Sequence, residues 1–259
     1  EQGYKLNIFL TDPSMRAVGE GHAVIGRTAH SVLHAKTRYW PGRALYHREG
    51  FGRIWQGPGK SGLVIALQAA LLDLTTDKGT SQVRLCPSIR MDREENGKGR
   101  LSTPDEMQRT VASLKKAGFT AVRLELAGAL DDEMKARGEC MPYRYPQEVL
   151  SHITSLMHAA KKAADTEMEV VVAANTNLST DGMTYLALRC QRNGVSLLEN
   201  PMALRHLPEQ AEACKEFSQP LGFGGDYHAL EDFAQGIKNQ VGTVLTPDAG
   251  RIGGVTVLK

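Results

Sequence analysis

Acidic residues follow three successive β-rich runs in the second half of the sequence. Glu199 ends the run VSLLE, Asp226 follows PLGFGG, and Asp248 follows GTVLTP. Because the carboxyl ends of parallel strands open on the same side of a βα fold, these side chains are expected to converge. Carboxylate oxygens suit a hard divalent cation such as magnesium. A lone carboxylate at such a position more often caps a helix or faces solvent, but the ordered set favours a metal site.

Two earlier runs depart from this pattern. The run VVVAAN, residues 170–175, is typical of a buried strand but ends in Ala173, Ala174 and Asn175 instead of an acid. The run FTAVRLEL, residues 119–126, carries Arg123 and Glu125 near its carboxyl end. Arg123 stays protonated and is a poor base. Glu125 could accept a proton, and it would also add negative charge near a metal.

The elements that would position these residues alternate along the chain. β-rich runs occupy residues 83–89, 119–126, 168–174, 195–199, 220–225 and 242–247, and helical patterns occupy 104–117, 146–164, 181–193, 208–217 and 229–239. Apolar residues recur at spacings of three and four in the helix expected at 146–164. Runs such as VVVAA are continuously apolar, which suits parallel strands covered on both faces. The order predicts an α/β fold, either a βα barrel or a doubly wound sheet.

The first 82 residues have a different character. Strands are expected at residues 4–10 and near 17–19, and the apolar segment 61–74 predicts a buried helix. Six later strands are fewer than the eight that a closed barrel needs. The sheet is therefore expected to have two open edges, which are closed either by further chain or by another subunit.

Composition and charge exclude several classes of partner. The 259 residues carry 31 basic and 29 acidic side chains, intermixed along the chain, for a net charge of +2. Nucleic acids and anionic membranes require a basic patch, so neither is an expected partner. No apolar run approaches the roughly 20 residues that cross a bilayer, and no signal-peptide pattern begins the chain. A cytoplasmic protein with a small polar ligand is expected.

The segments LLENPM (197–202), GGDYHALEDF (224–233) and TPDAGRIGGVTVLK (246–259), at their present spacing, resemble the enolase superfamily. The likeness is to its mandelate racemase and muconate-lactonizing branch, and VGEGHA (18–23) and the segment 57–74 resemble that branch's N-terminal domain. The resemblance implies an N-terminal α+β capping domain at residues 1–82. It also implies an incomplete modified TIM (β/α) barrel of about six strands at residues 83–259.

The resemblance also implies a chemistry. Members of the family hold Mg²⁺ with three acids and remove the proton next to a substrate carboxylate, which requires a metal for the developing charge and a base beside it. By this likeness Glu199 and Asp226 match the second and third metal ligands, and Asn200 replaces the usual second Glu. Ala173 stands where the first ligand belongs. Arg123 and Glu125 stand where the family has its two lysines.

Further site residues follow from the same likeness. Asp248 matches the acid that orients a seventh-strand His, and the sequence stops at Lys259 before such a His. Asn175 and His22 are candidate substrate-binding residues, with His22 in an expected loop. His228 is an alternative metal ligand, although a loop or helix-start position is the simpler interpretation.

Two hypotheses of different classes result. In one, the protein is an active Mg²⁺-dependent acid-sugar dehydratase or racemase, with Glu125 as base and Asp248 as orienting acid. In the other, it is a pseudoenzyme with a weakened Mg²⁺ site that binds a small carboxylate or sugar acid, or assembles as a homo-oligomer. Loss of one charge-stabilising group commonly costs a factor of about 100 to 1,000 in rate. Because a ligand and both lysines are replaced, we favour the second hypothesis.

Overall fold

The computed structural model describes residues 4–11, 18–25, 84–95, 98–126, 147–174, 178–203 and 206–252. The chain divides into two compact units. One consists of residues 83–225 and 234–246, and the other consists of residues 1–82, 226–233 and 247–259. The predicted helix at 61–74 lies outside the described residues, and the predicted capping domain with its boundary at residue 82 stays a proposal.

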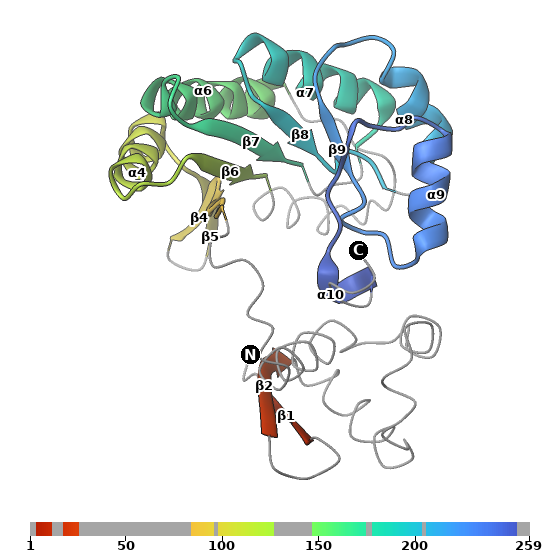
Figure 1. Ribbon diagram of the computed structural model, residues 1–259. Coiled ribbons are helices and arrows are strands. Elements are labelled where there is room, and N and C mark those ends of the chain that lie inside the picture. The colour runs from red at the N-terminus through yellow and green to blue at the C-terminus, as the bar shows by residue number, and fades with distance from the viewer. Residues whose placement is uncertain are drawn as a thin grey trace. The chain divides into compact units, whose positions relative to one another are not determined.

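A parallel sheet of six strands forms the centre of the first unit (Figure 1). The spatial order of its strands is β10-β9-β8-β7-β6-β3. Their bounds are β3 Ser88–Arg90, β6 Ala121–Glu125, β7 Glu169–Ala173, β8 Leu197–Glu199, β9 Leu221–Phe223 and β10 Val244–Leu245. Each strand pairs in parallel with its neighbour. The predicted alternation of parallel strands with helices is therefore confirmed.

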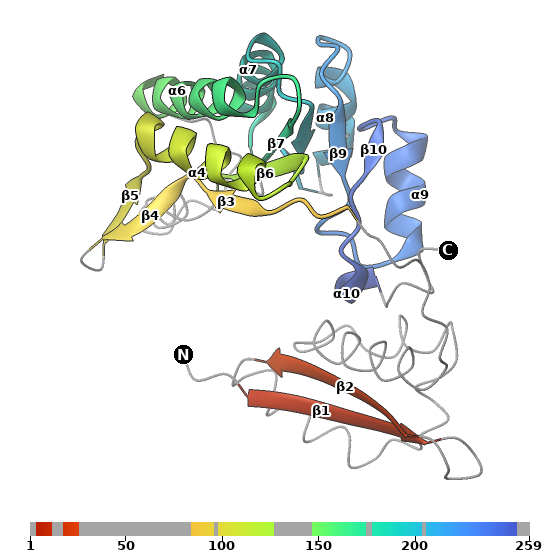
Figure 2. The same cartoon turned by 60° about the vertical axis from the view of Figure 1, so that its left-hand side comes forward.

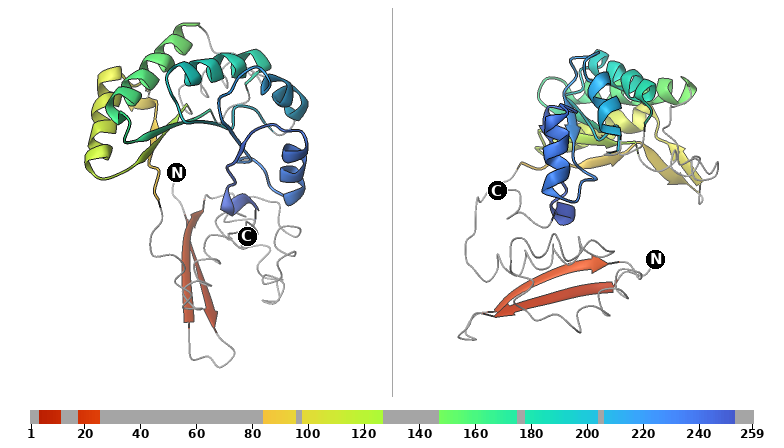
Figure 3. Two further views of the ribbon diagram at one scale, coloured as in Figure 1. Left: turned by 45° about the horizontal axis from the view of Figure 1, so that its top comes forward. Right: turned by 90° about the vertical axis from the view of Figure 1, so that its right-hand side faces the viewer.

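Helices connect these strands and cover one side of the sheet. They are α4 Pro104–Lys116, α6 Gln147–Ala164, α7 Thr180–Arg192, α8 Leu207–Ala213 and α9 Leu230–Lys238. The sheet is curved, with α4, α6, α7 and α8 on its convex side (Figure 3). Thr103 begins α4 with a capping box, because its hydroxyl accepts a hydrogen bond from the Glu106 amide and the Glu106 carboxylate accepts one from the Thr103 amide.

The two faces of the sheet have different contents. Leu124, Val172, Leu198 and Leu221 are in register across β6 to β9 and belong to the buried core that packs against the helices. Side chains alternate between the faces of a strand, so the residues on either side of each of these point to the opposite, concave face. Arg123, Glu125 and Glu199 are among them, which places them away from the core.

Other elements differ from their predictions. A two-stranded antiparallel hairpin, β4 (Asp92–Glu95) with β5 (Lys98–Leu101), follows β3 and precedes α4 in the chain (Figure 2). It was not predicted. In the other unit, β1 (Tyr4–Thr11) pairs with β2 (Val18–Ile25) over eight residues. The expected loop around His22 is therefore wrong, because its backbone is strand and pairs with Asn7. Among helices in the described part of the chain, none is both long and apolar enough to cross a membrane.

Candidate active site

Three of the predicted site residues, Arg123, Glu125 and Glu199, meet near the carboxyl ends of β6 and β8, on either side of β7. Glu125 on β6 is in register with Ala173 on β7, and Ala173 is in register with Glu199 on β8. The three positions therefore form one row across the sheet and share its concave face. Arg123 lies two residues before Glu125 on the same strand, so it also faces this side.

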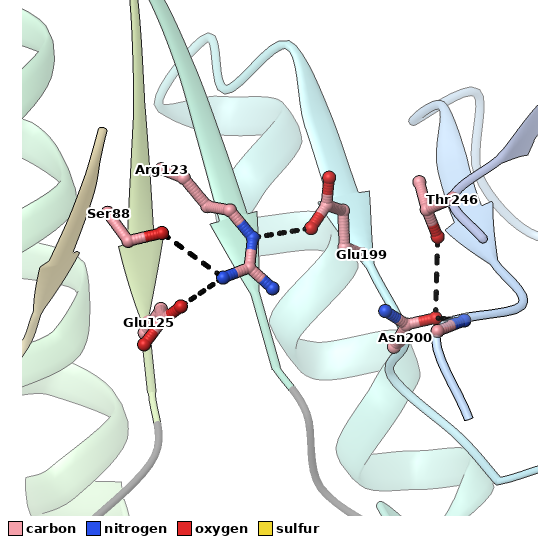
Figure 4. A network of polar contacts seen from close by, with 7 residues as sticks. Ser88, Arg123, Glu125, Glu199, Asn200 and Thr246 are labelled. Atoms are coloured by element: carbon pink, nitrogen blue, oxygen red, sulfur yellow. Dashed lines mark hydrogen bonds and ion pairs between the residues drawn. The ribbon is translucent and has the colours of Figure 1, made fainter. Parts of the chain in front are cut away.

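Arg123 connects the two carboxylates of the row (Figure 4). Its Nε donates a hydrogen bond to Glu199 Oε2 over 2.7 Å, and its Nη1 pairs with Glu125 Oε1. Nη1 also donates to Ser88 Oγ over 3.3 Å. The side chains of Arg123, Glu125 and Glu199 are 23%, 24% and 15% exposed. We call this set the Arg123 cluster.

The charges of the Arg123 cluster determine what it can do chemically. Two carboxylates and one guanidinium leave a single net negative charge. Because a guanidinium does not deprotonate in proteins, Arg123 cannot act as a base. Each carboxylate accepts a charge-assisted hydrogen bond, a stronger type than one between neutral groups. Glu125 and Glu199 are therefore already engaged by a cation that belongs to the chain.

Ala173 explains how Arg123 can reach Glu199 across the intervening strand. Its side chain is fully buried, although the residue is not part of the core that packs against the helices. A methyl group at this position leaves room above β7, where a longer side chain would stand between Glu125 and Glu199. On β9, Gly222 is in register with Glu199. A Cβ at Gly222 would lie 2.8 Å from Thr246 Cγ2, which is too close, so a glycine is needed there.

Asn200 ties together the loops beside Glu199. Its Oδ1 accepts a hydrogen bond from the Gly225 amide over 3.0 Å and from Thr246 Oγ1 over 3.5 Å. Asn200 has a φ of 48°, in the left-handed region that Asn tolerates better than most residues. The carboxyl ends of β8, β9 and β10 are therefore linked through one side chain (Figure 4).

Asp226 and Asp248 belong to the other compact unit. Burial raises the pKa of Tyr227, and the negative charges of Asp226 and Asp232 raise it further. Asp248 Oδ1 accepts a hydrogen bond from the Arg251 amide over 3.0 Å, at the start of the short helix α10 (Ala249–Ile252). Asp248 thus has the capping contact that is common for a lone acid at a helix start. Its convergence with Asp226 on Glu199 stays a prediction.

Three other candidates, Asn175, His22 and His228, are not part of the Arg123 cluster. Asn175 lies outside the described residues, and His22 is described only by its backbone in β2. The His228 amide donates to Asp232 Oδ2 over 2.9 Å just before α9, which is the helix-start position given above as the simpler interpretation. Ser88 was missed by the sequence analysis. Its signal was its place near the end of the first predicted strand, where a register argument would have set it beside Arg123.

The described residues do not fit a magnesium ion as they are arranged. Among them, no group of three or more His, Cys, Asp or Glu side chains is placed to hold a metal. Glu199, the predicted second ligand, is hydrogen bonded to Arg123. Ala173, at the predicted position of the first ligand, has no ligating atom.

Comparison with known proteins identifies the family. A model of the enolase C-terminal domain-like family matches residues 106–259. The chain is similar to a racemase from Streptomyces coelicolor A3(2) with bound magnesium, at 17% identity and a TM-score of 0.69, covering 98% of this chain and 75% of that chain. None of the curated proteins compared with the chain matches it.

Two further solved structures have a similar fold. One is a mandelate racemase/muconate lactonizing enzyme-like protein from Roseovarius sp. TM1035, at 16% identity and a TM-score of 0.71, covering 98% of this chain and 69% of that one. The other is an enolase from Bradyrhizobium complexed with magnesium and mandelic acid, at 15% identity and a TM-score of 0.71, covering 99% and 69%. With a family model that spans more than half of its length, the chain belongs to the enolase superfamily, in the mandelate racemase and muconate-lactonizing branch.

Proposed function

We propose that this protein, although it belongs to the superfamily, is impaired in the metal-dependent removal of an α-proton. We also propose that it binds a small carboxylate or sugar acid. One observation carries the proposal: the guanidinium of Arg123 is held between Glu125 and Glu199. It engages the carboxylate that would bind magnesium and the carboxylate that would act as base. Both groups that the chemistry needs are thus paired with the same cation.

Binding of an acid is supported by the donors that Arg123 retains. Its Nε and Nη1 are used within the cluster, whereas Nη2 has no hydrogen bond to any residue that the structure describes. A guanidinium has five N–H donors, and carboxylates are its common partners. The structural neighbour from Bradyrhizobium holds mandelic acid, a small hydroxy acid of the proposed class.

Exchange of the α-proton in deuterated water tests the proposal. The protein is incubated with a panel of hydroxy acids and sugar acids in millimolar Mg²⁺, and deuterium uptake is followed by mass spectrometry. We expect no uptake above the rate without protein, and we expect saturable binding of at least one acid by calorimetry. Uptake that is lost in Glu125→Gln would contradict the proposal.

The second candidate is an active Mg²⁺-dependent dehydratase or racemase. It is favoured by Glu199, which stands at the carboxyl end of β8 where the family has a ligand, and by neighbours that contain magnesium. For this activity, Arg123 would have to release Glu199.

Assembly as a homo-oligomer is also part of the first proposal. β3 and β10 are the outer strands of the described sheet, and a second copy of the chain could cover these open edges.

A further inference from the structure

We propose that the guanidinium of Arg123 is the resident counter-cation of Glu125 and Glu199, in the place that a divalent ion would otherwise take. Wild-type protein would then bind no divalent cation through Glu199, and a cation site would appear only when the charge of Arg123 is removed. The inference deepens the proposed function, on whose impaired metal chemistry it rests, and it assigns to Arg123 a positioning and charge-balancing role.

The first support is the path of the Arg123 side chain. Arg123 belongs to β6, but it reaches across β7 to Glu199 on β8. Neighbouring strands lie about 4.8 Å apart, so Glu125 and Glu199 project from backbones separated by roughly 10 Å. A cation between them must come from a long side chain or from solvent. Arg123 provides it because Ala173 in the middle of the row presents only a methyl group.

The second support is the use of donors. Three contacts of Arg123 hold the guanidinium, one each to Glu199, Glu125 and Ser88. These partners come from β8, β6 and β3, so the cation is fixed from strands on both sides. An exposed ion pair gains little because water screens it and two long side chains must be ordered. The side chains of Arg123, Glu125 and Glu199 are each less than a quarter exposed, and Ser88 adds a third contact.

The third support is charge. A divalent cation that ligated Glu199 Oε2 would lie next to a guanidinium nitrogen that is 2.7 Å from the same oxygen. Like charges at this separation repel strongly where water is partly excluded. The guanidinium and the divalent ion are therefore expected to exclude each other.

Substitution of Arg123 by Met tests the exclusion. Met has a similar length and no charge, so the variant leaves Glu125 and Glu199 without their counter-cation. Binding of Mn²⁺ is measured by electron paramagnetic resonance without any substrate. Thermal unfolding is followed with and without Mg²⁺. We expect Arg123→Met to bind Mn²⁺ at least tenfold more tightly than the wild type does. We also expect the midpoint of its thermal unfolding to rise when Mg²⁺ is added.

Three matched measurements complete the design. Arg123→Lys keeps the charge and should resemble the wild type in Mn²⁺ binding. Adding Glu199→Gln to Arg123→Met should abolish the new site. If Arg123→Met does not fold even with Mn²⁺ present, the wild type decides: its Mn²⁺ binding should be the same as that of Glu199→Gln. Wild-type binding that Glu199→Gln weakens, or a folded Arg123→Met with no gain in affinity, would overturn the inference.

The outcome is distinguishable from failure of the proposed function. If wild-type protein binds Mg²⁺ through Glu199 but exchanges no α-proton, the counter-cation role is wrong and the impaired chemistry stands. If wild-type protein exchanges the α-proton in millimolar Mg²⁺, and its Mn²⁺ binding is the same as that of Glu199→Gln, the impaired chemistry is wrong and the counter-cation role of Arg123 stands.

Discussion

At the scale of single residues, the negative charge of Glu199 acts on Cys86 as well as on Arg123. Partial burial raises the pKa of the Cys86 thiol, and the negative charge of Glu199 raises it further. Arg123 and Arg84 act in the opposite direction. Cys86 is exposed, so a small reagent can reach it. The thiol of Cys86 is therefore a reporter of the charge balance in the Arg123 cluster.

Replacement of Glu199 by Gln should lower the pKa of Cys86. The variant removes a negative charge that disfavours the thiolate, while the guanidinium of Arg123, which favours the thiolate, stays in place. Because only the thiolate is alkylated, Cys86 of the variant should react with iodoacetamide faster than Cys86 of the wild type below pH 9. The increase of this rate with pH should begin at a lower pH in the variant. Peptide mapping by mass spectrometry assigns the modified residue.

Glu167→Gln is the matched control for this experiment. Glu167 pairs with Lys115 and is not among the groups that shift the pKa of Cys86. Its pH profile should coincide with that of the wild type. Identical profiles for Glu199→Gln and Glu167→Gln would show that Glu199 does not control the charge at Cys86.

At the scale of elements, Asn200 holds the carboxyl ends of three strands together. We expect Asn200→Ala to lower the free energy of unfolding by about 2 kcal/mol. Two hydrogen bonds contribute roughly 0.5 to 1.5 kcal/mol each, and the left-handed backbone costs more without a short polar side chain. Urea unfolding measures the loss.

Asn200→Asp separates the hydrogen bonds from the volume of the side chain. Aspartate keeps an acceptor oxygen and also tolerates the left-handed region, so the loss should be less than half of that for Asn200→Ala. Thr246→Val removes only the longer contact, 3.5 Å, and should cost less than ~1 kcal/mol. Equal losses for the Ala and Asp variants would show that the hydrogen bonds accepted by Asn200 Oδ1 do not contribute to stability.

Element types were predictable from the sequence, whereas some pairings were not. The apolar period of residues 146–164 predicted α6 at Gln147–Ala164, because helix formation depends on local spacing. The β4–β5 hairpin was missed because Asp92–Glu95 and Lys98–Leu101 are largely charged and lack an apolar alternation. The resemblance to the family suggested a loop at His22, but β1 and β2 pair over eight residues there, so the backbone of His22 is strand.

At the scale of the whole molecule, stability should depend on the layer between the helices and the sheet. Leu156 on α6 is fully buried in this core. We expect Leu156→Ala to cost about 2 to 5 kcal/mol, because it removes buried methyl groups and leaves a cavity. Thermal or urea unfolding gives the value.

Leu85→Ala is the control with the same chemical change. Leu85 is 63% exposed, so its truncation should alter the free energy of unfolding by no more than about 0.5 kcal/mol. A loss at Leu156 no larger than at Leu85 would mean that this layer does not support the fold.

The candidate site was only partly predictable at this scale. The parallel order placed Glu125 and Glu199 at the carboxyl ends of the strands on either side of β7. The run VVVAAN already showed Ala173 at the position where the resemblance implies an acid. The pairing of Arg123 with both carboxylates was not expected. It depends on register and on the small size of Ala173, which are properties of three strands together. A single strand, read by itself, contains neither.

The separation of the two faces of the sheet has an evolutionary consequence. Folding selects the residues that meet the helices, such as Leu124, Val172 and Leu198, whereas the intervening positions on the concave face are released from that selection. Residues on the concave face can therefore be exchanged one at a time while the layer that supports the fold stays intact. The architecture is inherited as a tolerant scaffold on which a new specificity can evolve.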